Sequence, residues 1–421
     1  MNYIEKDKEK YWYTLFFLPL FFTPRGLYQS FVTADYLHLG DSGFVFPIYF
    51  FIGIFIFFLL LKSFILNGSL RIISSEIKFN LLILAMVGLF ISSAGVIVHS
   101  DISVYIRYIQ MLTGFVGLFI SWYLFEYKRL NVEKFFGKLG ILYFIIIILN
   151  YLYSFSQVGL ASFGRGLQPS LGIIDIYQTH VYYPFIINTI LFMSLPYIMK
   201  RYKYLFYIYI GVYLLYLLSW QVRGAILSFA VMIVIAIVFK FKLIQKIGIT
   251  VFLFLFLIAL VYYFDPELVL GRFSNIEGVK NFSGRTDIWL SVFTDFNTLK
   301  LIFGNLYFDQ DGVTAHNQYI ELLDMGGILL LLSLLAVLLN VFYLLLKTIK
   351  SKAIRNRNPN LLYYILILIV QWIIDFNVNV PMSNTNPSIF YWFYLNSVFV
   401  IYHLNKKGKP SLAMDKNDRG I

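Results

Sequence analysis

The sequence predicts an all-α, polytopic membrane protein, and three observations support this prediction. Of its 421 residues, 59% are hydrophobic and only 13% are charged, whereas about 25% of the residues in an average soluble domain are charged. The apolar residues gather in stretches of roughly 20, the length that a helix needs to cross a bilayer. The chain has no cysteine, which excludes a disulfide framework and thiol chemistry.

About twelve apolar stretches are long enough to be membrane spans. They lie near residues 11–33, 44–66, 79–98, 103–125, 139–156, 180–199, 204–220, 224–240, 247–264, 318–346, 361–376 and 388–403. The chain then divides into spans one to nine with short loops, a large extracytoplasmic loop, spans ten to twelve, and a cytoplasmic tail. These parts are residues 1–264, 265–317, 318–403 and 404–421. The charged start of the chain lacks the pattern of a cleaved signal peptide, so we expect a cytoplasmic tail there.

The lysines and arginines predict the orientation of the spans. With the N-terminus in the cytoplasm, 26 of the 34 fall on the inner side and 8 on the outer side. This asymmetry follows the positive-inside rule and places both termini in the cytoplasm of a multi-pass plasma-membrane protein. It also explains the net charge of +12 without a nucleic-acid partner, because the basic residues are spread over many short loops.

The basic residues on the two sides differ in kind. Six of the 8 outer residues are arginines, against six of the 26 inner ones. The outer arginines are Arg25, Arg107, Arg165, Arg223, Arg272 and Arg285. Orientation does not depend on which cation is used, but bidentate binding of phosphate or carboxylate favours arginine. The outer face is therefore predicted to hold an anion. The alternative is chance combined with binding to lipid headgroups.

The large loop is the longest polar interruption in the chain, and long loops of this kind are usually functional. Within it, residues 283–287 open a short amphipathic helix, with Ser283 or Thr286 as the expected N-cap. Its apolar residues share one face at helical spacing. They are Ile288, Trp289, Val292, Phe293 and Phe296. Arg285 falls in the first turn, where the helix already carries partial positive charge. That position suits a phosphate-binding arginine; the simpler interpretation is a surface arginine paired with Asp287.

Three other outer features contain candidate residues. Gly164-Arg165-Gly166 presents an arginine on flexible backbone between residues 156 and 177. Arg223 stands at the edge of a span, where insertion into hydrocarbon costs about 2.5–3.5 kcal/mol, so it needs a partner or a role unless it extends to the interface. Asp375 and Asn377 lie between the last two spans. Asparagines there suit sugar hydroxyls, but they suit any polar turn equally well.

At these residues the chain resembles the superfamily of bacterial O-antigen ligases and Wzy-type O-antigen or capsule polymerases. Arg223 and Leu227 match the ligases' arginine–leucine spacing, and His316 and Gly327 match their histidine–glycine spacing. His316-Asn317 also begins the polymerase pattern, although Leu330 stands where that pattern expects Gly, Thr or Tyr. Two further motifs match in family order. They are Gly284-Arg285-Thr286-Asp287-Ile288-Trp289 and Asp375-Phe376-Asn377 with Pro381.

The resemblance implies a membrane glycosyltransferase with a GT-C-like fold that works without a metal or other cofactor. Its substrates would be undecaprenyl-pyrophosphate-linked glycans, transferred in an inverting-type reaction on the outer membrane face. Besides the lipid bilayer, the partners would include a chain-length regulator and a flippase of the same pathway. The leading hypothesis is a polymerase that joins lipid-linked repeat units. One alternative is a ligase that moves finished glycan to lipid A core or wall. A flippase or transporter is an alternative of a different class, for which we find no internal repeat.

The chemistry assigns roles to the candidate residues. Bond breaking places negative charge on the leaving diphosphate, which Arg285 and Arg223 would stabilise, with Arg165 as a further candidate. His316 would remove the proton of the acceptor hydroxyl, and nearby arginines would favour its neutral form. The simpler interpretation of His316 is a structural histidine at the interface. The remaining substrate-binding candidates are Arg272, Asn317, Asp375 and Asn377.

One observation favours a metal site instead. Asp309-Gln310-Asp311 resembles the acidic pair with which soluble glycosyltransferases bind Mg²⁺ or Mn²⁺, and it lies close to His316 in the sequence. Two carboxylates in a turn that ends at Gly312 are more often a solvated loop. We therefore expect no metal site.

Overall fold

The computed structural model describes part of the chain, in ranges separated by gaps. These ranges are residues 22–24, 38–39, 42–43, 75–102, 104–105, 108, 111–112, 114–127, 130–158, 170–171, 174–176, 183–202, 205–220, 222–241, 243–263, 285–294, 297–306, 317–378 and 385–406. The predicted span 44–66 and the tail beyond residue 406 lie outside the described residues.

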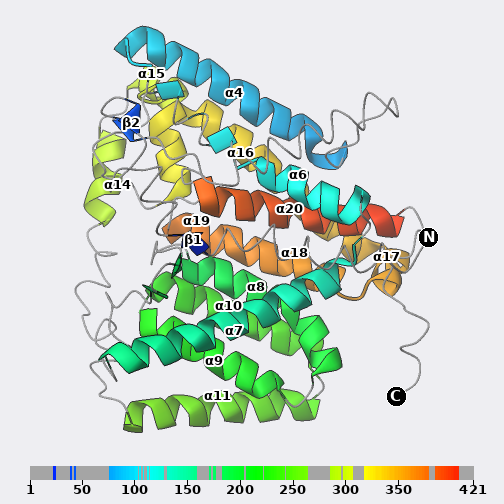
Figure 1. The fold of residues 1–421 in the computed structure, drawn as a ribbon. Helices are drawn as coiled ribbons and strands as arrows, with labels where there is room; N and C mark the ends of the chain where they lie inside the picture. The colour runs from blue at the N-terminus through cyan, green and yellow to red at the C-terminus, as the bar shows by residue number, and fades with distance from the viewer. Residues whose placement is uncertain are drawn as a thin grey trace.

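The described residues form mainly helices that lie side by side (Figure 1). The longer ones are α4 (Ser75–His99), α7 (Val132–Val158), α8 (Tyr183–Arg201), α9 (Phe206–Trp220), α10 (Arg223–Lys240), α11 (Leu243–Tyr263), α16 (Gln318–Lys350), α18 (Leu361–Val370) and α20 (Thr385–Lys406). Between them lie α6 (Val116–Trp122), α14 (Arg285–Thr294), α15 (Thr298–Phe303), α17 (Lys352–Arg357), α19 (Phe376–Val378) and the π-helices η1 (Tyr123–Tyr127) and η4 (Gln371–Asp375).

Within the described part, four helices are both long and apolar enough to cross a membrane. They are Ile77–His99, Arg223–Lys240, Gln318–Lys350 and the continuous segment Leu361–Val378. An 18-residue helix is about 27 Å long, close to the roughly 30 Å of a hydrocarbon core. The prediction of a helical, multi-pass membrane protein is confirmed at this level.

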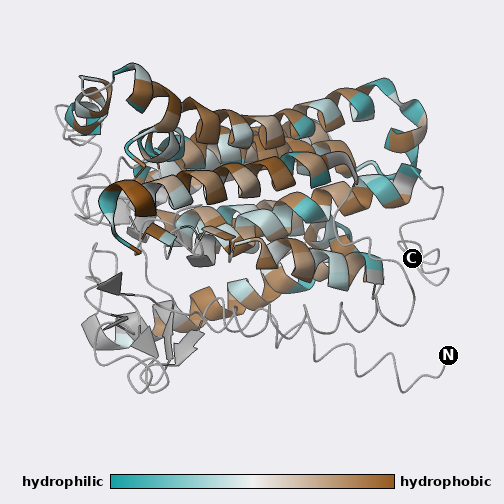
Figure 2. Ribbon diagram, turned by 90° about the horizontal axis from the view of Figure 1, so that it is seen from above, coloured by the Kyte–Doolittle hydropathy of each residue, from teal (hydrophilic) through white to brown (hydrophobic). Residues whose placement is uncertain are grey.

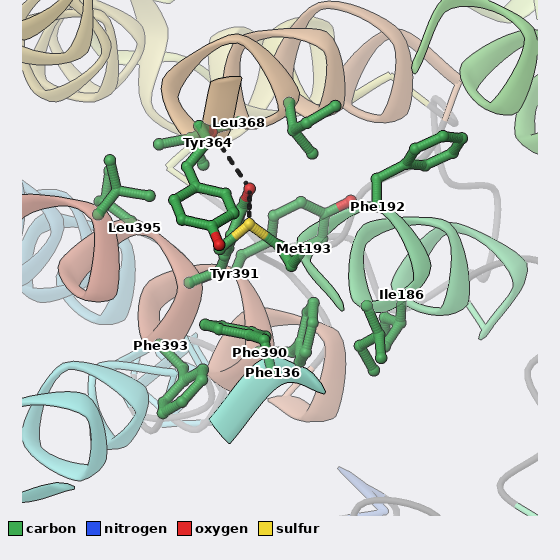
Figure 3. Packing of buried hydrophobic residues seen from close by; sticks show 14 of the residues in the cluster. Phe136, Ile186, Phe192, Met193, Tyr364, Leu368, Phe390, Tyr391, Phe393 and Leu395 are labelled. Atoms are coloured by element: carbon green, nitrogen blue, oxygen red, sulfur yellow. Dashed lines mark hydrogen bonds between the residues drawn. The ribbon is translucent and has the colours of Figure 1, made fainter. Parts of the chain in front are cut away.

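The core lies around α8, α18 and α20. Helix α20 packs on α6, α7 packs on α8, and α10 packs on both α8 and α18. Figure 3 shows Met193 of α8 beside Tyr364 of α18, with aromatic side chains of α20 near them. There the Tyr394 hydroxyl lies 2.8 Å from Met193 Sδ and donates to the Tyr364 carbonyl oxygen at 3.2 Å. The polar end of a buried tyrosine thus finds partners inside the bundle, as burial requires.

The outer surface of the bundle is apolar. Phe79, Leu82, Met86 and Phe90 follow one face of α4 at intervals of three or four residues, and all four are exposed. Figure 2 shows such hydrophobic positions along the outward sides of the helices. A contiguous exposed apolar surface on a folded chain marks contact with another apolar phase. On helices of membrane length, that phase is the lipid.

The described helices separate the predicted inner and outer residues to opposite ends. At one end, Lys240 Nζ donates to Asn360 Oδ1, and Asn360 Nδ2 donates to Glu133 Oε2 at 2.8 Å. These contacts join the end of α10, the start of α7 and the residue before α18. At the other end lie Arg223 and Val378, the start of α10 and the end of α19. We call this second end, with the helices α14 and α15 beside it, the site end.

Short strands replace part of one predicted span. Strand β1 (Phe22–Pro24) pairs with β5 (Ile174–Ile176), which also pairs with β4 (Ser170–Leu171). Strands β2 (His38–Leu39) and β3 (Ser42–Gly43) form a second pair. The prediction of a continuous helix over 11–33 is therefore wrong at Phe22–Pro24. Proline lacks the N–H that a helix interior needs, and edge-strand positions tolerate it.

Two other spans differ from their predicted form. In the span predicted at 103–125, the described residues 104–105, 108 and 111–112 are helical, a turn follows at Gly114 and Phe115, and α6 then runs from Val116 into the π-helix η1. The span predicted at 318–346 contains a break, because Gly326 and Gly327 leave helical geometry, with φ of −134° and +61°. In Figure 1 the short first part of α16 runs across the ends of neighbouring helices, and the long second part runs beside α4.

The break in α16 is held by the chain that follows α15. The backbone N–H of Asn305 donates to the Asp324 carbonyl at 2.7 Å, and that of Leu306 donates to the Met325 carbonyl at 3.1 Å. Asn305 Nδ2 also donates to Asp324 Oδ1 at 2.7 Å. A helix break frees backbone carbonyls that would cost several kcal/mol each in lipid without partners. Residues 305–306 supply those partners, and we call this contact the α15–α16 clamp.

Glycine is required at the centre of the clamp. A Cβ on Gly327 would lie 2.3 Å from the carbonyl carbon and oxygen of Ile302, and φ of +61° disfavours any L side chain. Gly304 approaches from the other side with φ of +71°, and a Cβ there would lie 2.5 Å from Gly326 N. The two backbones therefore pack directly on each other, with no room for a side chain between them.

We expect Gly327→Ala to destabilise the protein. The strained φ and the backbone clash together cost on the order of 2–4 kcal/mol, which thermal unfolding of the purified protein in detergent would measure as a lower midpoint. Gly248→Ala, in α11, is the matched control, since its Cβ would meet only the Tyr207 hydroxyl at 3.3 Å. Equal unfolding midpoints for the two variants would contradict the role of the clamp.

Candidate functional site

Arg285 is the first residue of α14, which agrees with its predicted place in the first turn of a short helix. Its Nη1 donates to the carbonyl oxygen of Val378 at 3.0 Å. The guanidinium therefore reaches from the large loop to the end of α19, across 93 residues of sequence. The structure gives this arginine a long-range contact at the site end, beyond the local pairing with Asp287 that the simpler interpretation offered.

The helix that Arg223 begins reaches the same point of the structure. It is the first residue of α10, and Val222 before it is extended. A Cβ on the next residue, Gly224, would lie 2.8 Å from Val378 Cγ2. The first turn of α10 thus packs directly against the residue whose carbonyl accepts from Arg285. Arg285 and the start of α10, which two spans separate in the sequence, are thus brought together at Val378.

Asn317 is the N-cap of α16. Its Oδ1 accepts from the backbone N–H groups of Tyr319 and Ile320, at 3.0 and 3.2 Å. Its Nδ2 donates to Asn377 Oδ1 at 3.3 Å. Asn377 Nδ2 in turn donates to the Ile373 carbonyl at 2.6 Å. One amide therefore starts α16 and ties it to α19, next to the contact of Arg285.

Aromatic side chains support this junction from within the bundle. The Tyr319 hydroxyl donates to the Trp372 carbonyl at 3.1 Å, and its ring lies 6.0 Å from that of Phe376. Phe376 stacks on Trp372 at 6.1 Å and meets Tyr391 edge-on at 5.2 Å. Rings in such arrangements attract one another beyond their burial. They hold the starts of α16 and α19 in a fixed relation.

Asp375 lies beneath the junction and is fully buried. Its Oδ2 accepts from the Tyr391 hydroxyl at 2.6 Å. The Ser228 hydroxyl of α10 also interacts with this carboxyl. The geometry falls short of a standard hydrogen bond, because neither Ser228 Oγ nor Asp375 Oδ1 has such a partner among the described residues. Asp375 thus belongs to the wall under the site. Its predicted contact with substrate stays a prediction.

Several candidates lie outside the described residues. They are His316, Arg165, Arg272, Asp309, Asp311, Ser283 and Pro381. Thr286 lies inside the first turn of α14, so it is not the N-cap. His99 has a structural partner, since its Nε2 lies 3.0 Å from the Asn305 carbonyl oxygen. Within the described part of the chain, no three His, Asp or Glu side chains cluster as metal ligands.

The arrangement can bind an anion. Two of the described cations, Arg223 and Arg285, each stand at the N-terminus of a helix, where backbone N–H groups also favour negative charge. Both helices meet Val378, and the Asn317–Asn377 amide pair adds hydrogen-bonding groups beside them. These residues come from α10, α14, α16 and α19. Four segments that are distant in the sequence thus supply one polar, basic region at the end of an apolar bundle.

Sequence reasoning missed three residues of this region. They are Gly224, Tyr319 and Val378. Gly224 follows Arg223 directly, and its lack of a side chain lets Val378 approach; a glycine at the start of a predicted span was the available signal. Tyr319 contributes a contact of its hydroxyl, and Val378 contributes its backbone carbonyl. No sequence pattern predicts either contact. Their partners are identified only by the packing.

The fold and this region define the class of protein: a helical, multi-pass membrane protein with a basic, amide-rich site at one end of its bundle. A scan against protein-family models finds no match, and no curated protein matches the chain.

We expect Asn317→Ala to lower the stability of the protein by about 0.5–2 kcal/mol, because the first turn of α16 loses its cap. Hydrogen exchange at the amides of Tyr319 and Ile320 would become faster. Asn317→Ser is the control, since serine caps helices about as well as asparagine. If alanine and serine variants exchange alike, the capping role is wrong.

Proposed function

We propose that the protein is a membrane glycosyltransferase that polymerises undecaprenyl-pyrophosphate-linked repeat units on the outer face of the plasma membrane. One observation carries the proposal: Arg285 and the first turn of α10, which begins with Arg223, both contact Val378, and Asn317 contacts the adjacent Asn377. The four motifs that suggested this enzyme class are far apart in the sequence. Residues from each of the four come together at the site end or adjoin residues that do.

The two arginines suit a diphosphate leaving group. When the bond between the sugar and the lipid diphosphate breaks, negative charge develops on the phosphate oxygens. Fixed guanidinium groups and helix N-termini stabilise that charge without reorganising, which is a large source of catalysis in such sites. Arg285 and Arg223 fill this role, and Arg165 and Arg272 are the further candidates from the outer loops.

His316 is the proposed general base. It precedes Asn317 directly, and consecutive Cα atoms are about 3.8 Å apart. Asn317 is fixed by its cap and by Asn377. A base at residue 316 would take the proton of the acceptor hydroxyl while the diphosphate leaves toward the arginines. The neighbouring positive charges would favour the neutral imidazole that this step needs.

The orientation follows from the basic residues. The end with Lys240, Lys347 and Lys350 faces the cytoplasm under the positive-inside rule, so the site end faces outward. Donor and acceptor glycans, both linked to lipid, would reach the site from the outer leaflet. In the same proposal, a flippase delivers the repeat units and a chain-length regulator works on the product.

A ligase and a flippase are the two alternative functions. A ligase that transfers finished glycan to lipid A core or wall would use the same arginines and base. A knockout distinguishes them: a lost polymerase leaves products of one repeat, and a lost ligase leaves long lipid-linked chains. A flippase would move lipid-linked units across liposomes without joining them. Asp309 and Asp311 would support a metal-dependent transferase, for which activity would fall in EDTA.

We expect Arg285→Lys to reduce turnover of lipid-linked repeat units by about 10²–10³-fold, because an ammonium group cannot reproduce the guanidinium fork. Turnover of purified protein in nanodiscs would measure this. Arg355→Lys is the matched control, on α17 at the opposite end of the bundle, and should leave turnover unchanged. Wild-type turnover in the Arg285 variant would remove its phosphate role.

We expect His316→Ala to lower the rate of transfer by about 10²–10⁴-fold, the usual contribution of a positioned general base. Unfolding temperature and binding of the lipid-linked donor should stay close to wild type, because the imidazole acts on the acceptor proton. Donor binding by microscale thermophoresis, measured beside turnover, separates the two effects. A variant that transfers at the wild-type rate would exclude His316 as the base.

A further inference from the structure

Helix α15 lies beside one end of the long apolar segment of α16. From Ile328 to Leu346, the second part of α16 runs for 19 residues without a charged side chain, which is about 28 Å of helix, close to the roughly 30 Å hydrocarbon core. Lys347 and Lys350 follow at its far end. The break at Gly326–Gly327 therefore stands at the opposite boundary of the hydrocarbon core. The α15–α16 clamp holds α15 against this break.

The same height follows from the neighbouring helix α4. Leu306 and Asn305 contact Gly95 and His99, in the last turns of α4. Phe303, the last residue of α15, lies with its ring 6.2 Å from that of Phe90. Helix α15 and the two residues after it are thus bound to two membrane-length helices, α4 and α16, toward the same end of their apolar segments. The contacts with both helices therefore indicate the same depth for α15.

An exposed apolar stripe runs from α4 onto α15. On α4, the stripe consists of Phe79, Leu82, Met86, Phe90 and Ile97, which share one face and are 54–79% exposed. Phe303 continues it through its contact with Phe90. Leu299, one helical turn before Phe303, is 69% exposed. The lipid-facing surface of α4 therefore has a direct extension on a helix of the large loop.

We propose that α15 is inserted in the outer leaflet of the bilayer, with Leu299 among the lipid acyl chains. The partner is lipid because the stripe is continuous with a surface that membrane-length helices present to lipid, and because its depth matches the edge of the hydrocarbon core. The large loop is then anchored in the membrane at α15. This inference concerns the depth of the loop and does not rest on the proposed glycosyl transfer.

The experiment uses the absence of cysteine from the chain, so that one introduced cysteine carries a single label. Leu299→Cys is labelled with an environment-sensitive fluorophore on the full-length protein in nanodiscs. Two quenchers are compared: aqueous iodide, and phospholipid with a nitroxide near the top of its acyl chain. Leu82→Cys on α4 is the lipid-exposed reference, and Asp287→Cys, at the exposed position Asp287 of α14, is the water-exposed reference.

We expect the label at position 299 to be quenched strongly by the nitroxide lipid and several-fold less by iodide than the label at position 287. Strong iodide quenching with no lipid quenching would overturn the proposal, because α15 would then face water. Protection from both quenchers would also overturn it, since another part of the chain would cover Leu299. Neither readout depends on catalysis, so failure of the proposed function would not change the result.

Discussion

The contact on which the site end depends is the α15–α16 clamp. Breaking a helix at the edge of a membrane frees carbonyl groups that lipid cannot satisfy. Here the Asp324 and Met325 carbonyls accept from the backbone of Asn305 and Leu306 instead. This exchange permits α16 to turn, so that its first part crosses the end of the bundle. The start of α16 then reaches Asn377, and its break binds α15 beside α4. Two positive-φ glycines make the approach sterically possible.

The polar region beyond this clamp is assembled from helix ends. Helices α10 and α14 each begin with an arginine, a position that the helix dipole disfavours unless an anion is present. Both begin next to Val378, whose carbonyl and side chain serve the two helices at once. Asn317 adds a third helix start. An enzyme that must hold a diphosphate without assistance from water would benefit from such fixed donors, and this is the physical basis of the proposed transferase.

The motif residues divide into two kinds. Asn317 caps α16, Gly327 permits its break, and Asp375 is buried under the junction with Tyr391. Each of these has a structural reason to be present, whatever the chemistry. Arg285 contacts Val378, and Arg223 begins the helix that packs on the same residue. His316 is placed near them only through its sequence neighbour Asn317. The proposed chemistry therefore rests on these three residues, and the others set where they stand.

The sequence by itself determined the class of the fold and the two ends of the bundle, because apolar length and charge asymmetry are local properties that the bilayer selects directly. It also determined that Arg285 opens a helix. It failed at Phe22–Pro24 and at Gly326–Gly327, where an edge-strand pairing and a backbone clamp override the apolar pattern. Only the tertiary structure decided that Arg285 and the first turn of α10 meet at Val378. That contact depends on a backbone carbonyl and on the angle of a broken helix, and neither leaves a pattern in the order of the residues.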